Sequence, residues 1–352
     1  MGLAVDGEVS RVHAPTGALR VVFLLFGLAL LVFLFARTGP GTVVDTVGRL
    51  GLAVFPIAAV YGAYQTVRAM ALAATVRKPR AMSLRDALLI RLSGEALQFL
   101  TFTGPFVAEP TKAWLLKNKG LGTAEGFAAT LTEYLAYMFT SAALSIAALG
   151  WLLTHGTLGG GLRVTATVLV SGMVAFLVAA AWAIVRRYYL LGAILESIAG
   201  LPGVRRRVRP DMVSVHGVEN LLLGIMHDRP ARFLGILALE SWSQVLLAFE
   251  LFLILRAFDL VAGFGTAVVI EGATKLVGLM FFFIPAQVGA AEGAHILVFR
   301  ALGLPAAAGF AVPFVRRIRS LAVAGVGLWA ISVLTRGAAR GSHTADAPAR
   351  RF

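Results

Sequence analysis

Ionisable side chains lie inside long apolar stretches of this sequence, and they are its best candidates for chemistry. Arg68 and Arg316 lie within apolar runs, and Glu109 and Glu292 each follow a break in such a run. A charge in hydrocarbon is costly, so these residues must be paired, neutralised or used to bind a polar group. Arginine holds a phosphate through paired hydrogen bonds. The pattern predicts a polar binding site inside an apolar protein.

The breaks themselves add backbone groups to this site. Where a helix begins at a break, its free N–H groups and its dipole attract an anion, so the amides of residues 104–108 and 289–291 are predicted to suit a phosphate. Two alternatives remain open at this point. Glu109 and Glu292 would also fit as simple helix caps, and Arg68 could instead extend to the membrane interface. The candidate substrate-binding residues are Glu109, Lys112, Glu292, Arg68, Arg316, Gly104, Pro105 and Gly289.

Other charges have a structural interpretation. Glu271 and Lys275 are four residues apart with the acid first, the favourable order in a helix, so a structural ion pair is expected. Arg316 suits either a lipid phosphate or a partner carboxylate such as Glu133. On the segment around Arg68, residues Tyr61, Tyr64 and Gln65 share its face and must point toward protein or a cavity.

Composition and motifs argue against several classes of catalytic site. The sequence has no cysteine, and its six histidines show no paired metal-ligand spacing. It also contains neither a phosphate-binding P-loop nor a GxSxG motif. We therefore predict no metal, no cofactor, no catalytic residue and no ATP hydrolysis. Two other functions stay open: an enzyme acting on a lipid-linked substrate, with Glu109 or Glu292 as acid or base, and a non-transporting scaffold for envelope synthesis.

The elements that must position these residues are membrane helices. Of the 352 residues, 58% are hydrophobic and 14% charged, and the mean hydropathy is +0.82. A helix needs roughly 20 apolar residues to cross the hydrocarbon core. The sequence predicts an all-α integral membrane protein, a single domain over 1–352, with about six spans: Leu19–Ala36, Leu50–Ala74, Gly126–Leu153, Leu162–Val185, Phe233–Leu255 and Ala306–Leu334.

Two further apolar regions are interrupted. Ser83–Lys119 is broken at Thr103-Gly104-Pro105, and Gly263–Arg300 is broken between Pro285 and Gly289. A break at membrane depth is tolerated where it packs in protein or lines a wet cavity. We expect each region to form a re-entrant helical hairpin that returns to its own side.

The distribution of basic residues predicts the orientation. The net charge is +14, and most Lys and Arg residues fall in segments that six spans place on one side. Because basic loops stay inside, both termini are expected in the cytoplasm, with the basic loop 186–232 meeting anionic lipid and residues 337–352 forming a disordered tail. Nucleic acid is not an expected partner.

The sequence matches itself without gaps at an offset of 183 residues. Glu109 falls on Glu292, Gly120 on Gly303, and the triplet 126–128 (Gly-Phe-Ala) on the triplet 309–311. Three predicted spans lie between the copies, so the second would be inverted in the membrane. The repeat halves cover about 50–153 and 231–335. Inverted halves with broken helices meeting near the midplane are typical of alternating-access carriers.

The two hairpins also resemble a known family. The segment 102–116, with its Pro105, Glu109 and Lys112, is similar to the first hairpin of the lysylphosphatidylglycerol synthase transmembrane family, and 285–292 followed by Arg316-Arg317 resembles the second. The Glu-Arg pair of that family stands here as Glu133-Tyr134.

The resemblance implies a flippase-like protein of the bacterial plasma membrane that moves a polar phospho- or glycolipid between leaflets. About 17 residues follow the last span, so the family's soluble aminoacyl-transferase domain is not expected here. The protein partner expected is a second copy of the chain in a homo-oligomer, or a separate lipid-modifying enzyme.

Overall fold

In the computed structural model, the described part of the chain comprises residues 32, 41, 48–76, 82–101, 104–199, 212–280 and 289–345. It is all helical, with no strand among these residues. The elements are η1 (Gly51–Ala53), α3 (Val54–Thr75), α4 (Leu84–Leu100), α5 (Pro105–Lys117), α6 (Thr123–His155), α7 (Gly160–Val185), α8 (Leu190–Ala199), α9 (Met212–His227), α10 (Pro230–Ala257), α11 (Phe264–Met280), α12 (Ala290–Ala301) and α13 (Ala306–Ala345).

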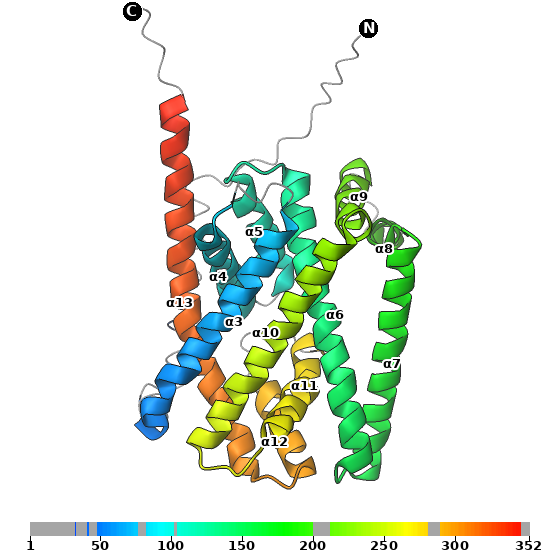
Figure 1. Cartoon of the computed structure of the whole chain (residues 1–352), viewed down its shortest axis with the longest axis vertical. Helices are drawn as coiled ribbons and strands as arrows, with labels where there is room; N and C mark the ends of the chain where they lie inside the picture. Colours follow the sequence, from blue (N-terminus) through cyan, green and yellow to red (C-terminus); the bar gives the residue numbers. More distant parts are fainter. Residues whose placement is uncertain are drawn as a thin grey trace, which may run out of the picture.

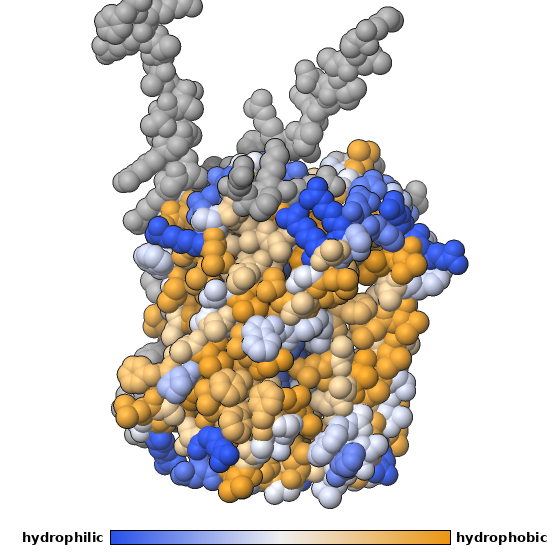
Figure 2. Space-filling model, in the orientation of Figure 1, coloured by the Kyte–Doolittle hydropathy of each residue, from blue (hydrophilic) through white to orange (hydrophobic). Residues whose placement is uncertain are grey.

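Five helical segments are long and apolar enough to cross a membrane. They are Gly48–Thr75, Thr123–His155, Gly160–Val185, Pro230–Ala257 and Ala306–Thr335. Each contains one of the predicted spans, so five of the six predicted segments form helices able to cross a membrane. The sixth, Leu19–Ala36, lies almost wholly outside the described residues. Figure 2 shows an apolar band across the middle of the molecule with hydrophilic residues at both ends, as a bilayer requires.

The interrupted regions fold as pairs of short helices. α4 and α5 pack against each other around the break before Pro105, and α11 and α12 pack against each other around the break before Gly289. The backbone of Gly104 has φ = 43° and that of Gly289 has φ = 85°, and both glycines precede a helix. These positive angles explain why glycine stands at the two breaks. Residues 102–103 and 281–288 lie outside the description.

The order and packing of the helices are repeated. α6 begins at Thr123 and α13 at Ala306, which are 183 residues apart, as are the positive-φ glycines Gly120 and Gly303. The contacts are reciprocal, since α4 packs on α13 as α11 packs on α6, and α3 packs on its counterpart α10. In Figure 1, α4 and α5 lie in the upper half of the bundle and α11 and α12 in the lower half.

One glycine pair makes the same close contact in both halves. A Cβ atom on Gly126 would lie 2.8 Å from the carbonyl oxygen of Ala113, and one on Gly309 would lie 3.0 Å from Cα of Ile296. Ala113 and Ile296 are also 183 positions apart. Each long helix therefore crosses its preceding short helix at the same glycine, which places α5 against α6 and α12 against α13.

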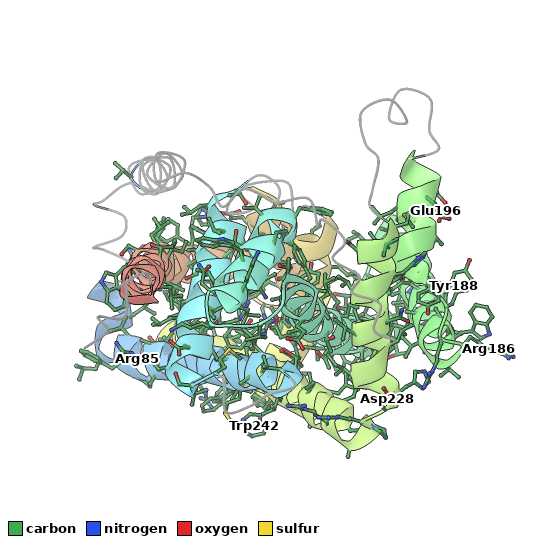
Figure 3. All side chains as sticks on the ribbon, turned by 90° about the horizontal axis from the view of Figure 1, so that it is seen from above. Arg85, Arg186, Tyr188, Glu196, Asp228 and Trp242 are labelled. Atoms are coloured by element: carbon green, nitrogen blue, oxygen red, sulfur yellow. The ribbon has the colours of Figure 1, made fainter. Side chains whose placement is uncertain are left out.

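The remaining helices lie at the edge of the bundle. α7 contacts α6, and only Ala166 and Ala183 among its residues are buried, so most of its surface is available to lipid. Beyond it, α8 and α9 lie at the same end of the molecule as α4 and α5 (Figure 1). Seen from above, Arg186 and Tyr188 project outward at this edge, opposite Arg85 (Figure 3). The basic residues 205–209 of the predicted loop lie outside the described residues.

Candidate functional site

A cavity of about 750 Å³ lies between the two pairs of short helices. Gly104, Pro105 and Glu109 line it from the first pair, and Ala291 and His295 from the second. α3, α6 and α13 add further wall, with four tyrosines and most of its cations. The chemically distinctive wall residues are Tyr61, Tyr64, Tyr134, Tyr137, Lys275, Arg316, Arg317 and Arg319. A pocket with this wall can hold an anion and stack a ring or cation against the aromatic faces.

The cavity reaches the surface of the bundle. Phe106, which follows Pro105 at the tip of the first pair, lines the cavity and is 73% exposed. The neighbouring wall is apolar, with Phe99, Phe127 and Leu131. A molecule with a polar end and an apolar body could therefore place the first inside the cavity and leave the second toward lipid.

Five buried residues form an ion-pair network behind one wall, with an acid at each end. Arg68 lies between Glu240 at 3.1 Å and Glu133 at 2.5 Å. Lys112 then lies between Glu133 at 2.9 Å and Glu109 at 2.8 Å. We call this order, Glu240–Arg68–Glu133–Lys112–Glu109, the acid-ended network. It joins α10, α3, α6 and α5, and its three carboxylates exceed its two cations by one.

A second network on the other side of the cavity has a base at each end. Glu271 lies 3.2 Å from Lys275 and 2.6 Å from Arg316. Arg316 also lies 3.6 Å from Glu250, which pairs with Arg319. The base-ended network is thus Lys275–Glu271–Arg316–Glu250–Arg319, with three cations and two carboxylates. It joins α11, α13 and α10.

The two networks mirror each other in charge. Their central residues, Glu133 on α6 and Arg316 on α13, are 183 positions apart and so occupy equivalent places in the repeat. The acid-ended network exposes only Glu109 to the cavity, whereas the base-ended network exposes every member but Glu250. The cavity wall consequently holds four cations, Lys275, Arg316, Arg317 and Arg319, against three acids, Glu95, Glu109 and Glu271.

Two smaller ion pairs stand beside these networks. Arg91 pairs with Glu95 at 2.8 Å on α4, and Glu95 accepts a hydrogen bond from the hydroxyl of Tyr61 at 3.1 Å. Arg317 pairs with Glu292 between α13 and α12. The guanidinium of Arg319 lies 3.6 Å above the centre of the Tyr61 ring and so connects the two sides of the site.

The predicted site residues divide into two groups. Gly104, Pro105, Glu109 and Arg316 line the cavity. Arg68 and Lys112 lie behind it in the acid-ended network, while Glu292 and Gly289 lie at the start of α12 outside its lining. The Glu271–Lys275 ion pair is present, but Arg316 extends it into a larger network.

Two alternatives from the sequence are answered by these contacts. Arg68 is only 3% exposed and contacts two carboxylates, so it does not extend to the membrane interface. Arg316 pairs with Glu271 and Glu250 and not with Glu133, because α13 meets α10 and α11 at this level and Glu133 is held by Arg68 and Lys112.

The two repeated glutamates have different roles at their helices. The carboxylate of Glu292 accepts a hydrogen bond from the N–H of Gly289 at 2.8 Å and so caps α12. The carboxylate of Glu292 therefore occupies the Gly289 amide, which is one of the amides predicted from the sequence to bind a phosphate. Glu109 makes no such cap, because α5 begins at Pro105, further ahead of it, and its carboxylate reaches Lys112 instead.

Three residues of the site, Glu95, Glu250 and Tyr137, are not among those predicted from the sequence. Glu95 and Glu250 were not expected there, although each is an acid within an apolar helix, which is the signal that pointed to Arg68. Tyr137 was also not expected, although the guanidinium of Arg68 lies 3.8 Å from its ring centre. Among the described residues, no cluster of three His, Asp or Glu side chains could hold a metal ion.

Comparison with known proteins identifies the family. A family model described as the lysylphosphatidylglycerol synthase TM region matches residues 18–327. No curated protein and no solved structure matches the sequence. The matched range includes the five described spans up to residue 327 and both pairs of short helices that enclose the cavity. The chain therefore belongs to the lysylphosphatidylglycerol synthase transmembrane family, and it is a multi-pass membrane protein.

Proposed function

We propose that this protein is a lipid transporter of the plasma membrane, which moves the polar headgroup of a phospho- or glycolipid between leaflets without ATP hydrolysis. The observation that carries the proposal is the cavity, whose wall holds Lys275, Arg316 and Arg319 within an apolar bundle. A phosphate entering there meets three cations that are already ordered by Glu271 and Glu250. Ordered cations lose little entropy on binding an anion.

The opening at Phe106 supports a lipid as the occupant. Its apolar side chain and those of Phe99 and Leu131 would contact acyl chains while the headgroup sits deeper, beside Arg316. A headgroup would then cross the apolar layer surrounded by protein polar groups, which removes most of the cost of dehydrating it.

The proposed membrane arrangement follows from the repeat. In it, α4–α5 and α11–α12 are re-entrant hairpins that enter from opposite sides, with both termini in the cytoplasm. Three spans, α6, α7 and α10, separate the two pairs, and the pairs lie in opposite halves of the bundle in Figure 1. Exchange of contacts between the hairpins and the long helices would open the cavity to each side in turn. The basic segment 186–232 would lie on cytoplasmic anionic lipid.

Reconstitution tests the function directly. The full chain is placed in liposomes containing acyl-labelled fluorescent phosphatidylglycerol, and a membrane-impermeant quencher reports the label that reaches the outer leaflet. Wild-type protein should make inner-leaflet label accessible, and Arg316→Gln should slow this strongly. Labelled lipid that stays protected would exclude transport and favour a scaffold. A change in lipid mass would favour an enzyme.

A further inference from the structure

The acid-ended network carries one more negative charge than its cations neutralise. Arg68 and Lys112 are the two cations that pair with the three carboxylates of Glu109, Glu133 and Glu240. Each of these five side chains is at most 7% exposed, so water does little to stabilise the excess charge. No additional Lys or Arg lies within 4 Å of the three carboxylates in the part of the protein that is described. A single bound proton would make the network neutral, which burial strongly favours.

The network has one end at which a proton can enter. Glu133, at the centre, is held by both cations, and Glu240, at the other end, is fully buried beside Ser243. Glu109 lines the cavity, and its Oε2 atom is buried without a hydrogen-bond partner. Its other oxygen contacts Lys112. Glu109 is thus the one member of the network on the cavity wall, and Oε2 is its unpaired oxygen.

The surroundings of Glu109 come from three helices. Lys112 lies on α5 itself, Glu133 and Tyr134 face it from α6, and Arg91, paired with Glu95, faces it from α4. Across the cavity stands the base-ended network, which carries one excess positive charge. An anion bound at that network neutralises its excess, and a proton on Glu109 does the same for the acid-ended network.

From this geometry we propose that Glu109 carries an exchangeable proton and that the protein moves this proton together with an anionic lipid headgroup. The inference rests on the proposed function. The proton passes from cavity water to Oε2 of Glu109 on one side of the membrane and returns to water on the other, and no covalent bond of the lipid changes. Filling either network alone leaves an unbalanced charge in the cavity, whereas filling both does not. Binding of the headgroup and binding of the proton therefore favour each other.

A pH gradient across liposomes tests the coupling. The vesicles contain the full chain and acyl-labelled phosphatidylglycerol, with the membrane potential clamped by potassium and valinomycin. Wild-type protein should accumulate label in the leaflet facing the alkaline side, by several-fold over the opposite leaflet. Glu109→Gln mimics the protonated acid, so it should still equilibrate lipid but without regard to the gradient. Glu125→Gln, on an exposed residue of α6, should behave as wild type.

A second variant separates coupling from a local role of Glu109. Glu240→Gln removes the excess charge at the far, sealed end and leaves Glu109 in place, so the network is neutral without a proton. Accumulation along the gradient should then fall several-fold although Glu109 is intact. Melting temperatures in detergent confirm that each variant is folded.

The outcomes are distinct. Lipid transfer by wild type that ignores the gradient overturns the proton coupling and leaves the transport function standing. Gradient-driven accumulation that persists in folded Glu109→Gln overturns the assignment to Glu109. Absence of transfer by wild type under every condition overturns the transport function and this inference with it.

Discussion

Glu133 and Arg316 occupy equivalent positions on α6 and α13, yet they carry opposite charges and contact no common partner. Each is the centre of its own network and touches two residues of the other sign. The two halves of the protein therefore use the same backbone position to solve the same problem, the burial of several charges, with the signs exchanged. Each network alone carries one unbalanced charge, and the seven acids and seven bases of the site balance only when both networks are counted.

The first prediction concerns the central acid. Glu133→Gln removes the one acid that contacts both Arg68 and Lys112 and leaves each cation a single carboxylate, Glu240 or Glu109. Two charged hydrogen bonds are weakened, and such bonds contribute about 1.5 to 3 kcal/mol each. We expect a large fall in the melting temperature in detergent. Glu125→Gln on the same helix, which only caps its exposed start, should shift it far less. Equal shifts would mean that the network contributes little.

The second prediction concerns the close crossing of α5 and α6. In a helix interior, Gly→Ala usually stabilises by about 0.5 to 1 kcal/mol. At Gly126 the added Cβ would meet the Ala113 carbonyl at 2.8 Å, so Gly126→Ala should instead destabilise, by about 1 to 3 kcal/mol as overpacking does. Gly150→Ala is the matched control on α6, because nothing lies within 4 Å of its new Cβ. Melting of the two variants should shift in opposite directions.

The third prediction concerns the position of Lys112. A Cβ on Gly94 would lie 2.8 Å from Cδ of Lys112, so the glycine makes room for the lysine stem. Gly94→Ala should push the ammonium away from Glu109 and Glu133 and slow lipid transfer about tenfold, the equivalent of ~1.4 kcal/mol. Gly62→Ala on α3 has open space and should transfer at the wild-type rate. A normal rate in Gly94→Ala would show that the exact place of Lys112 is unimportant.

The fourth prediction concerns orientation. The protein has no native cysteine, so single cysteines can be introduced without background. Asn118→Cys, at the exposed end of α5, should react with an impermeant maleimide only after the cell is permeabilised. Val261→Cys, 96% exposed before α11, should react in intact cells. Labelling of both sites from the same side would contradict the inverted arrangement.

The sequence predicts those features of the fold that depend on local properties. Five spans follow from hydropathy, and the breaks at Gly104 and Gly289 follow from residues that stop a helix or permit positive φ. The place of Gly126 and Gly309 in the repeat was also readable, although their contacts with the short helices were not. Such contacts depend on how helices far apart in the sequence come to cross.

The candidate site was predicted less completely for the same reason. A lone acid such as Glu240 or Glu250 reveals that it needs a partner, but the sequence does not say which cation reaches it. Arg316 could have met Glu133 if the repeated helices faced each other directly. Their separation by the cavity gives each a different set of neighbours. The ion pair Glu271–Lys275 was predictable because both residues lie on one helix.

The exchanged signs at residues 133 and 316 also bear on ancestry. If the halves descend from one duplicated segment, they have since specialised so far that neither can replace the other. The acid-ended network needs both halves, because its Glu240 lies on α10 in the second half and pairs with Arg68 on α3 in the first. A dimer of two first halves would leave Arg68 without Glu240, and a dimer of two second halves would leave Glu240 buried without its arginine. Each half therefore completes an ion pair of the other, and loss of either charge in this pair is expected to be tolerated only when its partner in the other half changes to match.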